Sequence, residues 1–510
     1  MKLLSRIDHE KGRRVILALI FLSAFLLRLA VFSLTIDVPG DGPSRAAIAY
    51  AWSKAPSCQL YGVWLPGHSY LAGLFSFFFE NPLSSARLFN VMLGTITLPL
   101  FYLLIRKVYD PATALISTSI LAFLPLHIGL SASSLSEVSF ALEIIAGTFF
   151  LVTASETDTA KKQAVYVAAS ILSLCMAVMT RYEAWMFIPV FPLYYFWKTR
   201  KIRASILIIA VLMVFPSIWT VNNYLYLGAP FEGFTSASAR SYGAQPANLS
   251  DAITTIIRKT RYHLGWPVSV LAVLGLAIQF FQTAKRNIDA KKMLYILIAC
   301  IFWAGVLAYA MARGRALYDR YLLFAFILCL PFSALPLSSL ISFSGHHKPQ
   351  YRRQITAGVI LLSVALVVSV FYKPHVYTYK NLHRRYTPFF VTLWRPTEIK
   401  NAADWVKNSP YRESSVLLTE IEGQSWYFSS YLPEAGERRL VAASYVPDSV
   451  IQGFLKTRRP SLLIACDDDS AVIARIEHLL GKNIGDDLLI HAEKFVKVYD
   501  ISSVFKSTQF

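Results

Sequence analysis

The sequence predicts a polytopic α-helical membrane protein that carries a small soluble α/β domain at its C-terminal end. Three observations lead to this fold class: 55% of the 510 residues are hydrophobic, long apolar runs recur up to residue 372, and basic residues gather between those runs. A hydrophobic share of this size, with a mean hydropathy of +0.46, excludes an ordinary soluble globular protein.

The apolar runs predict about eleven transmembrane helices. Each run approaches the roughly 20 residues that a helix needs to cross the hydrocarbon core of a bilayer. The predicted spans are residues 15–36, 86–106, 112–128, 134–154, 163–180, 182–198, 203–221, 263–283, 292–312, 319–342 and 355–372.

The charge pattern predicts which loops face the cytoplasm. Basic residues precede the first run and recur between later runs, at Lys2–Arg14, Arg106–Lys107, Lys161–Lys162, Lys198–Arg203, Lys285–Lys292 and Lys348–Arg353. Because loops rich in Lys and Arg stay cytoplasmic, we expect a multi-pass plasma-membrane protein with a cytoplasmic N-terminus. An odd number of spans then places the C-terminal domain outside the cytoplasm. The net charge of +19 is explained by this topology, and nucleic-acid binding is not expected.

Two domains are predicted, residues 1–372 in the membrane and residues 373–510 outside it. The first extracytoplasmic loop, 37–85, contains two amphipathic segments that we expect to lie as short helices in the interface. Residues 222–262 are polar and predict a mobile loop. In the tail, "SVLLTE", "RRLVAA" and "PSLLIAC" predict strands, "TEIKNAADWVKN", "DSVIQGFLKT" and "DSAVIARIEHLL" predict helices, and "DLLIHAEKFVKVYDI" predicts two more strands.

Two carboxylates, Asp37 and Asp41, follow the first apolar run at once, on the predicted outer face. Turn formation and helix capping would explain either residue alone. The alternative is a carboxylate that accepts a proton from a hydroxyl group, or that holds a divalent cation such as Mg²⁺ or Mn²⁺. The spacing of four residues allows both interpretations.

Other outer corners of the predicted bundle also carry charge. Arginine is sparse on outer faces, and its planar guanidinium group suits phosphate. A neighbouring carboxylate is the simpler partner, as Glu183 is for Arg181. We expect a substrate-binding site for a phosphate and a sugar among Glu137, Arg181, Glu183, Arg313, Arg315, Arg320 and Tyr321.

Three further residues near the outer face allow two interpretations. Arg28 lies inside the first span, where a charge either serves a function or extends to the headgroups. His68 and His127 fall at the outer interface, where a structural role is the stronger expectation. Arg28 and His68 are included among the candidate substrate-binding residues. Asp467–Asp469 follow a strand and are expected to cap a helix.

The order of these motifs resembles the GT-C membrane glycosyltransferases, over about residues 10–345. The resemblance rests on the acidic turn after the first span, followed by "YGVWLPGHSYL", "SSLSEVSF", "MTRYEAW", "NNYLYLGAPFEGF" and "RYLLFAFILCLP". It is strongest to the branch of protein O-mannosyltransferases and lipid A aminoarabinose transferases. The Trp-Trp-Asp-Tyr-Gly type of motif found in oligosaccharyltransferases is missing from the tail.

The resemblance implies an enzyme of the cell envelope. It would move a sugar from a polyprenyl-phosphate donor to an extracytoplasmic lipid, glycan or protein acceptor, usually with inversion. It also implies that the catalytic acid of the first loop is Asp41, with Asp37 as the second choice. The family often has an adjacent acid pair here, whereas three residues separate the two aspartates of this chain, which leaves a bound divalent cation open.

Two rival functions are left open by the sequence. A transporter or flippase for lipid-linked substrates would use buried charges to guide its cargo, but such proteins commonly have repeated halves and broken helices at the midplane. Neither is evident in this sequence, whose charges gather at one face. A polysaccharide ligase or polymerase would be a related transferase that acts on a glycan.

Overall fold

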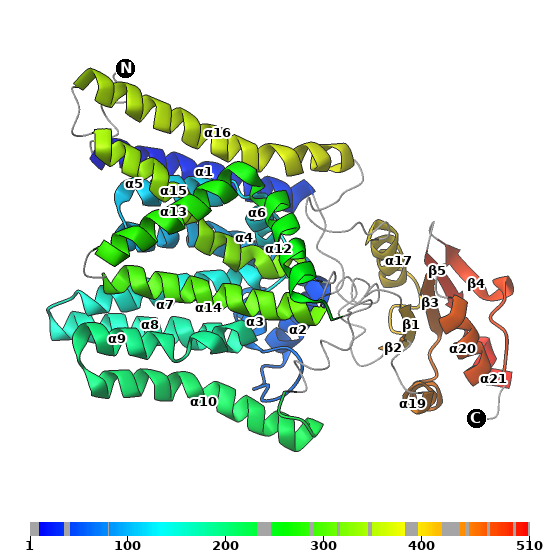
Figure 1. Ribbon diagram of the computed structural model, residues 1–510. Helices are drawn as coiled ribbons and strands as arrows, with labels where there is room; N and C mark the ends of the chain where they lie inside the picture. Colours follow the sequence, from blue (N-terminus) through cyan, green and yellow to red (C-terminus); the bar gives the residue numbers. More distant parts are fainter. Residues whose placement is uncertain are drawn as a thin grey trace.

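The computed structural model describes residues 10–34, 41–79, 81–231, 246–285, 289–313, 317–344, 349–382, 396–420, 439–443, 448–466, 470–492 and 496–507. Within these ranges a bundle of long helices is followed by a small sheet with its own helices (Figure 1). The predicted fold class, a polytopic helical membrane protein with a C-terminal α/β unit, is confirmed.

Nine helices of the described ranges are long and apolar enough to cross a membrane. They are α1 (Glu10–Leu34), α4 (Pro82–Val108), α7 (Glu137–Ser155), α8 (Ala160–Thr180), α10 (Ile202–Leu227), α13 (Gly265–Lys285), α14 (Ala290–Arg313), α15 (Leu323–Ser344) and α16 (Pro349–Leu382). A tenth span is possible if α5 (Pro111–Ala122) and α6 (Pro125–Ser131) count as one helix bent by 60°.

The predicted span at 182–198 is not a single helix. A 3₁₀ segment, η2 (Tyr182–Phe187), is followed by the short helix α9 (Val190–Thr199), and Pro189 lies at the junction. Proline lacks the backbone N–H that a continuing helix requires, so the break falls here. The prediction of eleven uninterrupted spans is therefore too high for the described ranges.

Three shorter helices lie at one end of the bundle: α2 (Asp41–Lys54), α3 (Gly67–Ser76) and α12 (Leu249–His263) (Figure 1). The first two are the short helices predicted for loop 37–85. The prediction of a mobile loop over 222–262 is wrong at both ends, because α10 continues to Leu227 and α12 begins at Leu249. Residues 232–245 lie outside the described ranges.

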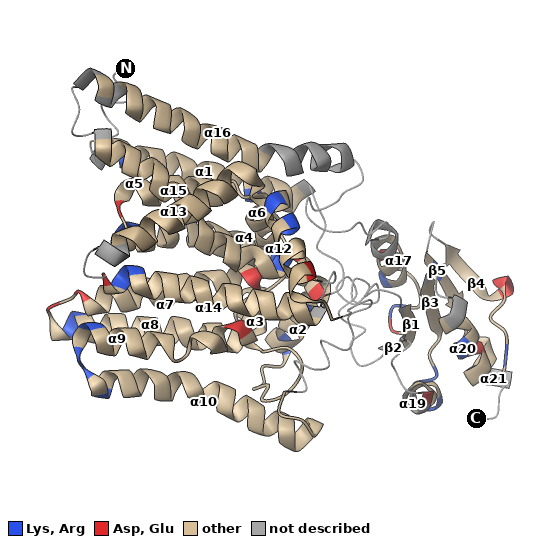
Figure 2. Cartoon of the chain, viewed as in Figure 1, with Lys and Arg blue, Asp and Glu red and all other residues tan. Residues whose placement is uncertain are grey.

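Basic residues gather at the opposite end of the bundle, where α4 ends, α8 begins and α9 meets α10 (Figure 2). Glu156 joins two of these tracts there, because it pairs with Lys107 at 2.9 Å and with Lys291 at 2.8 Å. These basic tracts therefore share one end of the bundle, as the charge pattern predicted. Which end of the bundle faces the cytoplasm stays a prediction.

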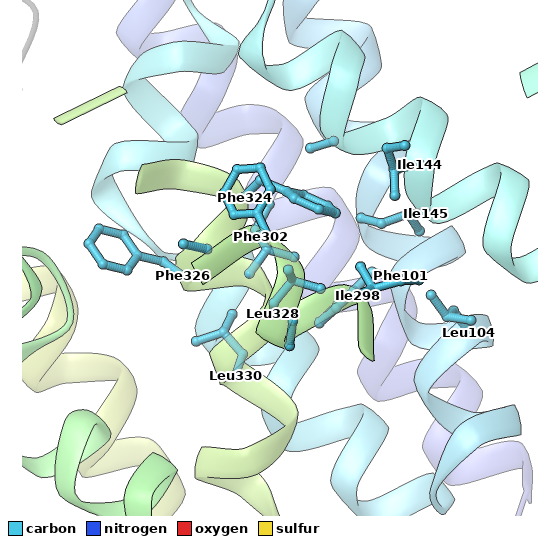
Figure 3. Packing of buried hydrophobic residues seen from close by; sticks show 14 of the residues in the cluster. Phe101, Leu104, Ile144, Ile145, Ile298, Phe302, Phe324, Phe326, Leu328 and Leu330 are labelled. Atoms are coloured by element: carbon cyan, nitrogen blue, oxygen red, sulfur yellow. The ribbon is translucent and has the colours of Figure 1, made fainter. Parts of the chain in front are cut away.

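Apolar side chains from α4, α7, α14 and α15 fill the middle of the bundle. Figure 3 shows this packing for Phe101, Ile144, Phe302, Phe324 and other buried residues. Since lipid tails are as apolar as these side chains, van der Waals packing holds membrane helices together. Small residues help, and α13 approaches α15 so closely that a Cβ atom on Gly275 would lie 1.8 Å from the carbonyl oxygen of Phe332.

The C-terminal unit is a five-stranded sheet in the order β2-β1-β3-β5-β4. The strands are β1 (Val416–Glu420), β2 (Arg439–Ala443), β3 (Leu462–Cys466), β4 (Leu489–Ala492) and β5 (Val496–Asp500), and β5 is antiparallel to both its neighbours. Helix α17 (Pro396–Asn408) packs on one face, while α19 (Asp448–Arg458), α20 (Ser470–Leu480) and α21 (Ser502–Ser507) supply the apolar residues of the other. The strands and helices α17, α19 and α20 lie where the sequence predicted them, whereas α21 was not predicted.

The predicted domain boundary at 372 falls inside α16, which continues to Leu382, so this boundary stays a prediction. The predicted helix cap at Asp467–Asp469 lies outside the described residues.

Candidate functional site

Asp41 is the first residue of α2 and forms an ion pair with a distant segment. Arg320 donates a hydrogen bond from Nη2 to Asp41 Oδ2 at 2.5 Å. An acid in the first turn also faces the positive end of the helix dipole. The structure therefore brings together two residues that the sequence predicted as parts of one site.

Arg320 lies in the 3₁₀ segment η4 (Asp319–Leu322), directly before α15, and only 12% of its side chain is exposed. Besides Asp41, it faces Glu137 of α7, whose Oε1 lies 3.7 Å from Arg320 Nε. Arg320 therefore stands between two carboxylates that come from different helices.

Arg181 continues this arrangement from the junction of α8 and η2. Its Nη1 donates to Glu137 Oε1 at 2.7 Å, and its Nη2 donates to Glu183 Oε1 at 2.6 Å. Opposite charges consequently alternate through five side chains, which we name the ion chain: Asp41, Arg320, Glu137, Arg181 and Glu183.

Tyr321 lies against both arginines of the ion chain. The guanidinium carbons of Arg181 and Arg320 lie 5.2 and 5.0 Å from the centre of its ring, within the range of cation–π contacts. Its hydroxyl oxygen also accepts a hydrogen bond from Arg320 Nη2 at 3.2 Å. An aromatic ring in this position holds two like charges at a fixed spacing.

Arg45 belongs to the same site, although the sequence analysis did not select it. It follows Asp41 by four residues on α2, a spacing that puts both side chains on one face of the helix. Its guanidinium group lies over the ring of Trp64, 5.1 Å from the ring centre. This i, i+4 relation was the signal that could have identified Arg45.

The charges of the site set its protonation states. Burial alone would raise the pKa of the Asp41 carboxyl, but Arg320 and Arg45 outweigh burial and lower that pKa below its ordinary value. Burial lowers the pKa of the Arg45 guanidinium, whereas Glu183 and Glu137 overcome burial and raise the pKa of Arg181. Asp41 is therefore a carboxylate at neutral pH.

Three polar atoms of the site are buried and have no hydrogen-bond partner among the described residues: Arg45 Nη1, Arg320 Nε and Glu137 Oε2. Buried polar atoms in proteins are nearly always paired with protein, water or ligand. These two donors and one acceptor are therefore available to a ligand with complementary groups.

His68 does not belong to the ion chain. Its side chain is fully buried, with Nδ1 2.8 Å from Ser139 Oγ and Nε2 3.1 Å from the carbonyl oxygen of Ser134. Burial, together with Arg45, lowers the pKa of His68 to about 3, so the ring is neutral. These contacts favour a structural role in which His68 joins α3 to the start of α7.

Arg28 also lies apart from the ion chain. Its guanidinium group donates to the carbonyl oxygens of Ala24 and Ala122, to Ser131 Oγ at 3.3 Å and to His127 Nδ1 at 2.6 Å. Ala122 is the last residue of α5, and the bend before α6 leaves its carbonyl without a helical partner. Arg28 thus stabilises the broken helix instead of contacting the charged site.

The remaining predicted site residues cannot be placed. Arg313 is the last residue of α14, but its side chain is not described, and Asp37 and Arg315 lie outside the described residues. Their proposed roles stay predictions.

The described side chains do not fit a divalent cation. Among them, no three His, Cys, Asp or Glu residues converge, and each of Asp41, Glu137 and Glu183 bonds an arginine. Magnesium and calcium sites require several oxygen ligands directed at one point. A cation at Asp41 would have to displace Arg320 and gain ligands from outside the described ranges.

Comparisons with known proteins agree with this architecture. Residues 63–222 match the profile of a family described as dolichyl-phosphate-mannose-protein mannosyltransferase. This segment contains Glu137, Arg181 and Glu183, but it covers less than half of the chain. No curated protein sequence is significantly similar.

Two solved structures share the fold at low sequence identity. The Archaeoglobus fulgidus oligosaccharyltransferase, tethered to an acceptor peptide, superposes with a TM-score of 0.61 at 11% identity, over 93% of this chain and 71% of that chain. ArnT from Cupriavidus metallidurans, bound to undecaprenyl phosphate, superposes with a TM-score of 0.61 at 12% identity, over 94% and 97%. The chain therefore shares the fold of these two membrane proteins, and its residues 63–222 are similar to the mannosyltransferase family.

Proposed function

We propose that the chain is a membrane glycosyltransferase that uses a polyprenyl-phosphate sugar donor. The acceptor is a lipid, glycan or protein hydroxyl group on the side of the membrane where α2 and α3 lie, and transfer inverts the anomeric carbon. The observation that carries this proposal is the ion pair of Asp41 and Arg320 beside buried guanidinium nitrogens that have no hydrogen-bond partner among the described residues. Two solved structures of similar fold, ArnT with undecaprenyl phosphate and the Archaeoglobus fulgidus oligosaccharyltransferase with a dolichol phosphate, support the class of donor.

Arg45 and Arg320 are the proposed ligands of the donor phosphate. Both present a buried nitrogen that lacks a hydrogen-bond partner among the described residues, at Nη1 and Nε respectively. Negative charge builds on the phosphate oxygen as the sugar leaves, and cations fixed in advance at that oxygen lower the barrier. Arg181 is already held by Glu137 and Glu183. We therefore assign it the role of positioning Arg320 and Tyr321, and not that of a direct phosphate ligand.

Asp41 is the proposed general base. The acceptor oxygen attacks the anomeric carbon, the carbon–oxygen bond to the phosphate breaks, and its electron pair stays on the phosphate. The acceptor hydroxyl loses its proton to Asp41 as the new bond forms. A carboxylate with a lowered pKa is fully ionised at neutral pH and is ready to accept that proton.

The donor itself would free this base. Arg320 Nη2 donates its hydrogen bond to Asp41 Oδ2. A donor phosphate bound at Arg320 Nε places negative charge beside the guanidinium group that pairs with Asp41. We propose that this weakens the ion pair and makes the carboxylate available when the donor is bound. A second oxygen of the site, Glu137 Oε2, can accept a hydrogen bond from a sugar hydroxyl group of the bound donor.

We further propose that the N-terminus is cytoplasmic and that the site opens on the opposite side of the membrane. The basic tracts at the other end of the bundle support this orientation (Figure 2). No step of the reaction proposed here involves a metal ion, because the carboxylates of the described site are already paired with arginines.

The test is donor consumption by the purified chain in lipid nanodiscs. A panel of polyprenyl-phosphate-linked sugars is supplied together with lipid, glycan and peptide acceptors that carry hydroxyl groups, and free polyprenyl phosphate is measured for wild type and Asp41→Asn. We expect Asp41→Asn to reduce the rate about 10²–10⁴-fold, the usual contribution of a general base. Asp158→Asn is the matched control, because Asp158 is an exposed acid just before α8.

Two outcomes would count against the proposal. Full activity of Asp41→Asn would show that Asp41 is not the general base. If wild type consumes none of the lipid-linked sugars, transport of such a lipid becomes the stronger function.

A further inference from the structure

Helix α12 (Leu249–His263) divides into three sectors along its length. One sector packs on the bundle and buries Ala252, Thr255 and His263. A second sector is apolar but exposed: Leu249, Ile253 and Ile257 have 51%, 41% and 50% of their surface accessible. These three residues recur every fourth position, so they form one row along the helix.

The third sector is polar and basic. Arg258 and Arg261 are exposed there, together with Thr254. The acid of this helix, Asp251, lies in the first turn, where it complements the helix dipole. An exposed apolar row beside an exposed basic row is typical of a helix that lies in a membrane interface.

The neighbouring helix fixes the depth of α12. Only Leu264 separates α12 from α13, which begins at Gly265 and is one of the nine candidate membrane spans. Helix α12 runs across the end of the bundle, roughly perpendicular to the long helices (Figure 1). Trp266 is 51% exposed at this junction, and the Arg261 guanidinium group lies 5.6 Å from the centre of its ring. Tryptophan is enriched at the level of the lipid headgroups.

We propose that α12 is an interfacial lipid-binding surface, on which Leu249, Ile253 and Ile257 insert into the acyl boundary and Arg258 and Arg261 bind anionic phospholipid headgroups. Charge complementarity and the adjoining membrane span identify the bilayer as the occupant. The apolar row of such helices enters the boundary by about 5–10 Å.

This surface also lies next to η4, the segment that carries Arg320. Lys259, on the buried side of α12, forms an ion pair with Asp319, and His263 Nε2 lies 3.2 Å from the same carboxylate. Asp319 immediately precedes Arg320 in η4. One side of α12 therefore faces the lipid, while its buried side contacts the segment that carries Arg320.

The test places a photo-crosslinking amino acid, p-benzoylphenylalanine, at single positions of the intact protein. The protein is reconstituted in nanodiscs of equal parts phosphatidylcholine and phosphatidylglycerol, irradiated, and analysed by mass spectrometry for lipid adducts. We expect lipid adducts from positions 253 and 257 and none from position 254, which lies on the polar sector. Equal adducts at 253 and 254, or none at 253, would overturn the insertion.

The charge of the surface is tested in the same preparation. With the crosslinker at position 253, we expect phosphatidylglycerol adducts to exceed phosphatidylcholine adducts, and Arg258→Gln with Arg261→Gln to remove that excess. Thr254→Gln is the matched control and should preserve it. An excess that survives loss of both arginines would contradict the anionic headgroup site. Because no sugar transfer is measured, these outcomes are independent of the proposed enzymatic function.

Discussion

Arg320 Nη2 lies 2.5 Å from Asp41 Oδ2, and this ion pair joins the start of α2 to η4, directly before α15, across 279 residues of sequence. The proposed base is therefore neutralised by a cation that the proposed donor also requires. A substrate phosphate at Arg320 Nε would share this guanidinium group with Asp41 and weaken the ion pair. This relationship couples donor binding to activation of the base.

The ion pair predicts how the reaction depends on pH. Arg320 and Arg45 lower the pKa of Asp41 despite burial, so the carboxylate of the free enzyme stays ionised down to below the ordinary value of about 4. We expect kcat/KM, which reports the free enzyme, to show no acidic limb from Asp41 above that pH. The acidic limb of kcat should lie at higher pH, because the bound phosphate adds negative charge and weakens the ion pair of Arg320 with Asp41. Profiles with a saturating donor and with a limiting donor measure the two limbs, and coincident limbs would contradict a weakened ion pair in the donor complex.

The same pair predicts how stability depends on pH. A carboxyl group with a lower pKa in the folded than in the unfolded state stabilises the fold above its unfolded pKa, and that contribution is lost as pH falls through the folded pKa. Wild type should therefore exceed Asp41→Asn in thermal stability at neutral pH, and the difference should shrink in acid below pH of about 4. Thermal unfolding of both proteins across this range measures it. A constant difference at all pH values would show that ionisation of Asp41 is not the cause.

Loss of Arg45 should impair catalysis without loss of stability. Its Nη1 is buried and has no hydrogen-bond partner among the described residues. Arg45→Gln therefore removes a buried charge whose hydrogen bonds within the fold are incomplete. We expect kcat/KM for the lipid-linked donor to fall about 10²–10³-fold, the usual cost of one preorganised donor at a developing negative charge. Thermal unfolding should be unchanged or shifted upward. Arg45→Lys keeps the charge and should retain part of the rate, whereas equal loss in both variants would argue against an electrostatic role.

The sequence predicted the fold class and most of the charged site because both depend on patterns along the chain. Hydropathy and basic tracts locate the helices, and outer-face arginines drew attention to Arg181 and Arg320. The sequence could not distinguish Arg28 from them, because an arginine inside a span is compatible with phosphate, with headgroups or with a helix end. The deciding fact is the bend between α5 and α6, which exposes the Ala122 carbonyl, and that bend depends on tertiary packing. Arg45 was missed for the converse reason, because its role requires knowing that α2 begins at Asp41.

Arg28 should prove to be a stabilising residue. Its guanidinium group is fully buried and bonds only neutral groups among the described residues, at Ala24, Ala122, His127 and Ser131. Arg28→Ala leaves buried acceptors unpaired, and each such group costs about 1–3 kcal/mol. We expect a lower unfolding temperature, with donor affinity per folded molecule unchanged in a binding assay. A loss of donor affinity at normal stability would instead show that Arg28 contributes to substrate binding.

Removal of divalent cations should leave sugar transfer unchanged. The carboxylates of Asp41, Glu137 and Glu183 each accept a hydrogen bond from an arginine, and a cation would have to compete with those guanidinium groups for the same oxygens. The transfer rate is measured before and after treatment with EDTA, and elemental analysis of the treated protein confirms that bound metal is gone. A loss of activity that Mg²⁺ or Mn²⁺ restores would contradict this expectation. It would favour a cation held by Asp41 with Asp37, and Arg320 would then be free for the phosphate even before the donor arrives.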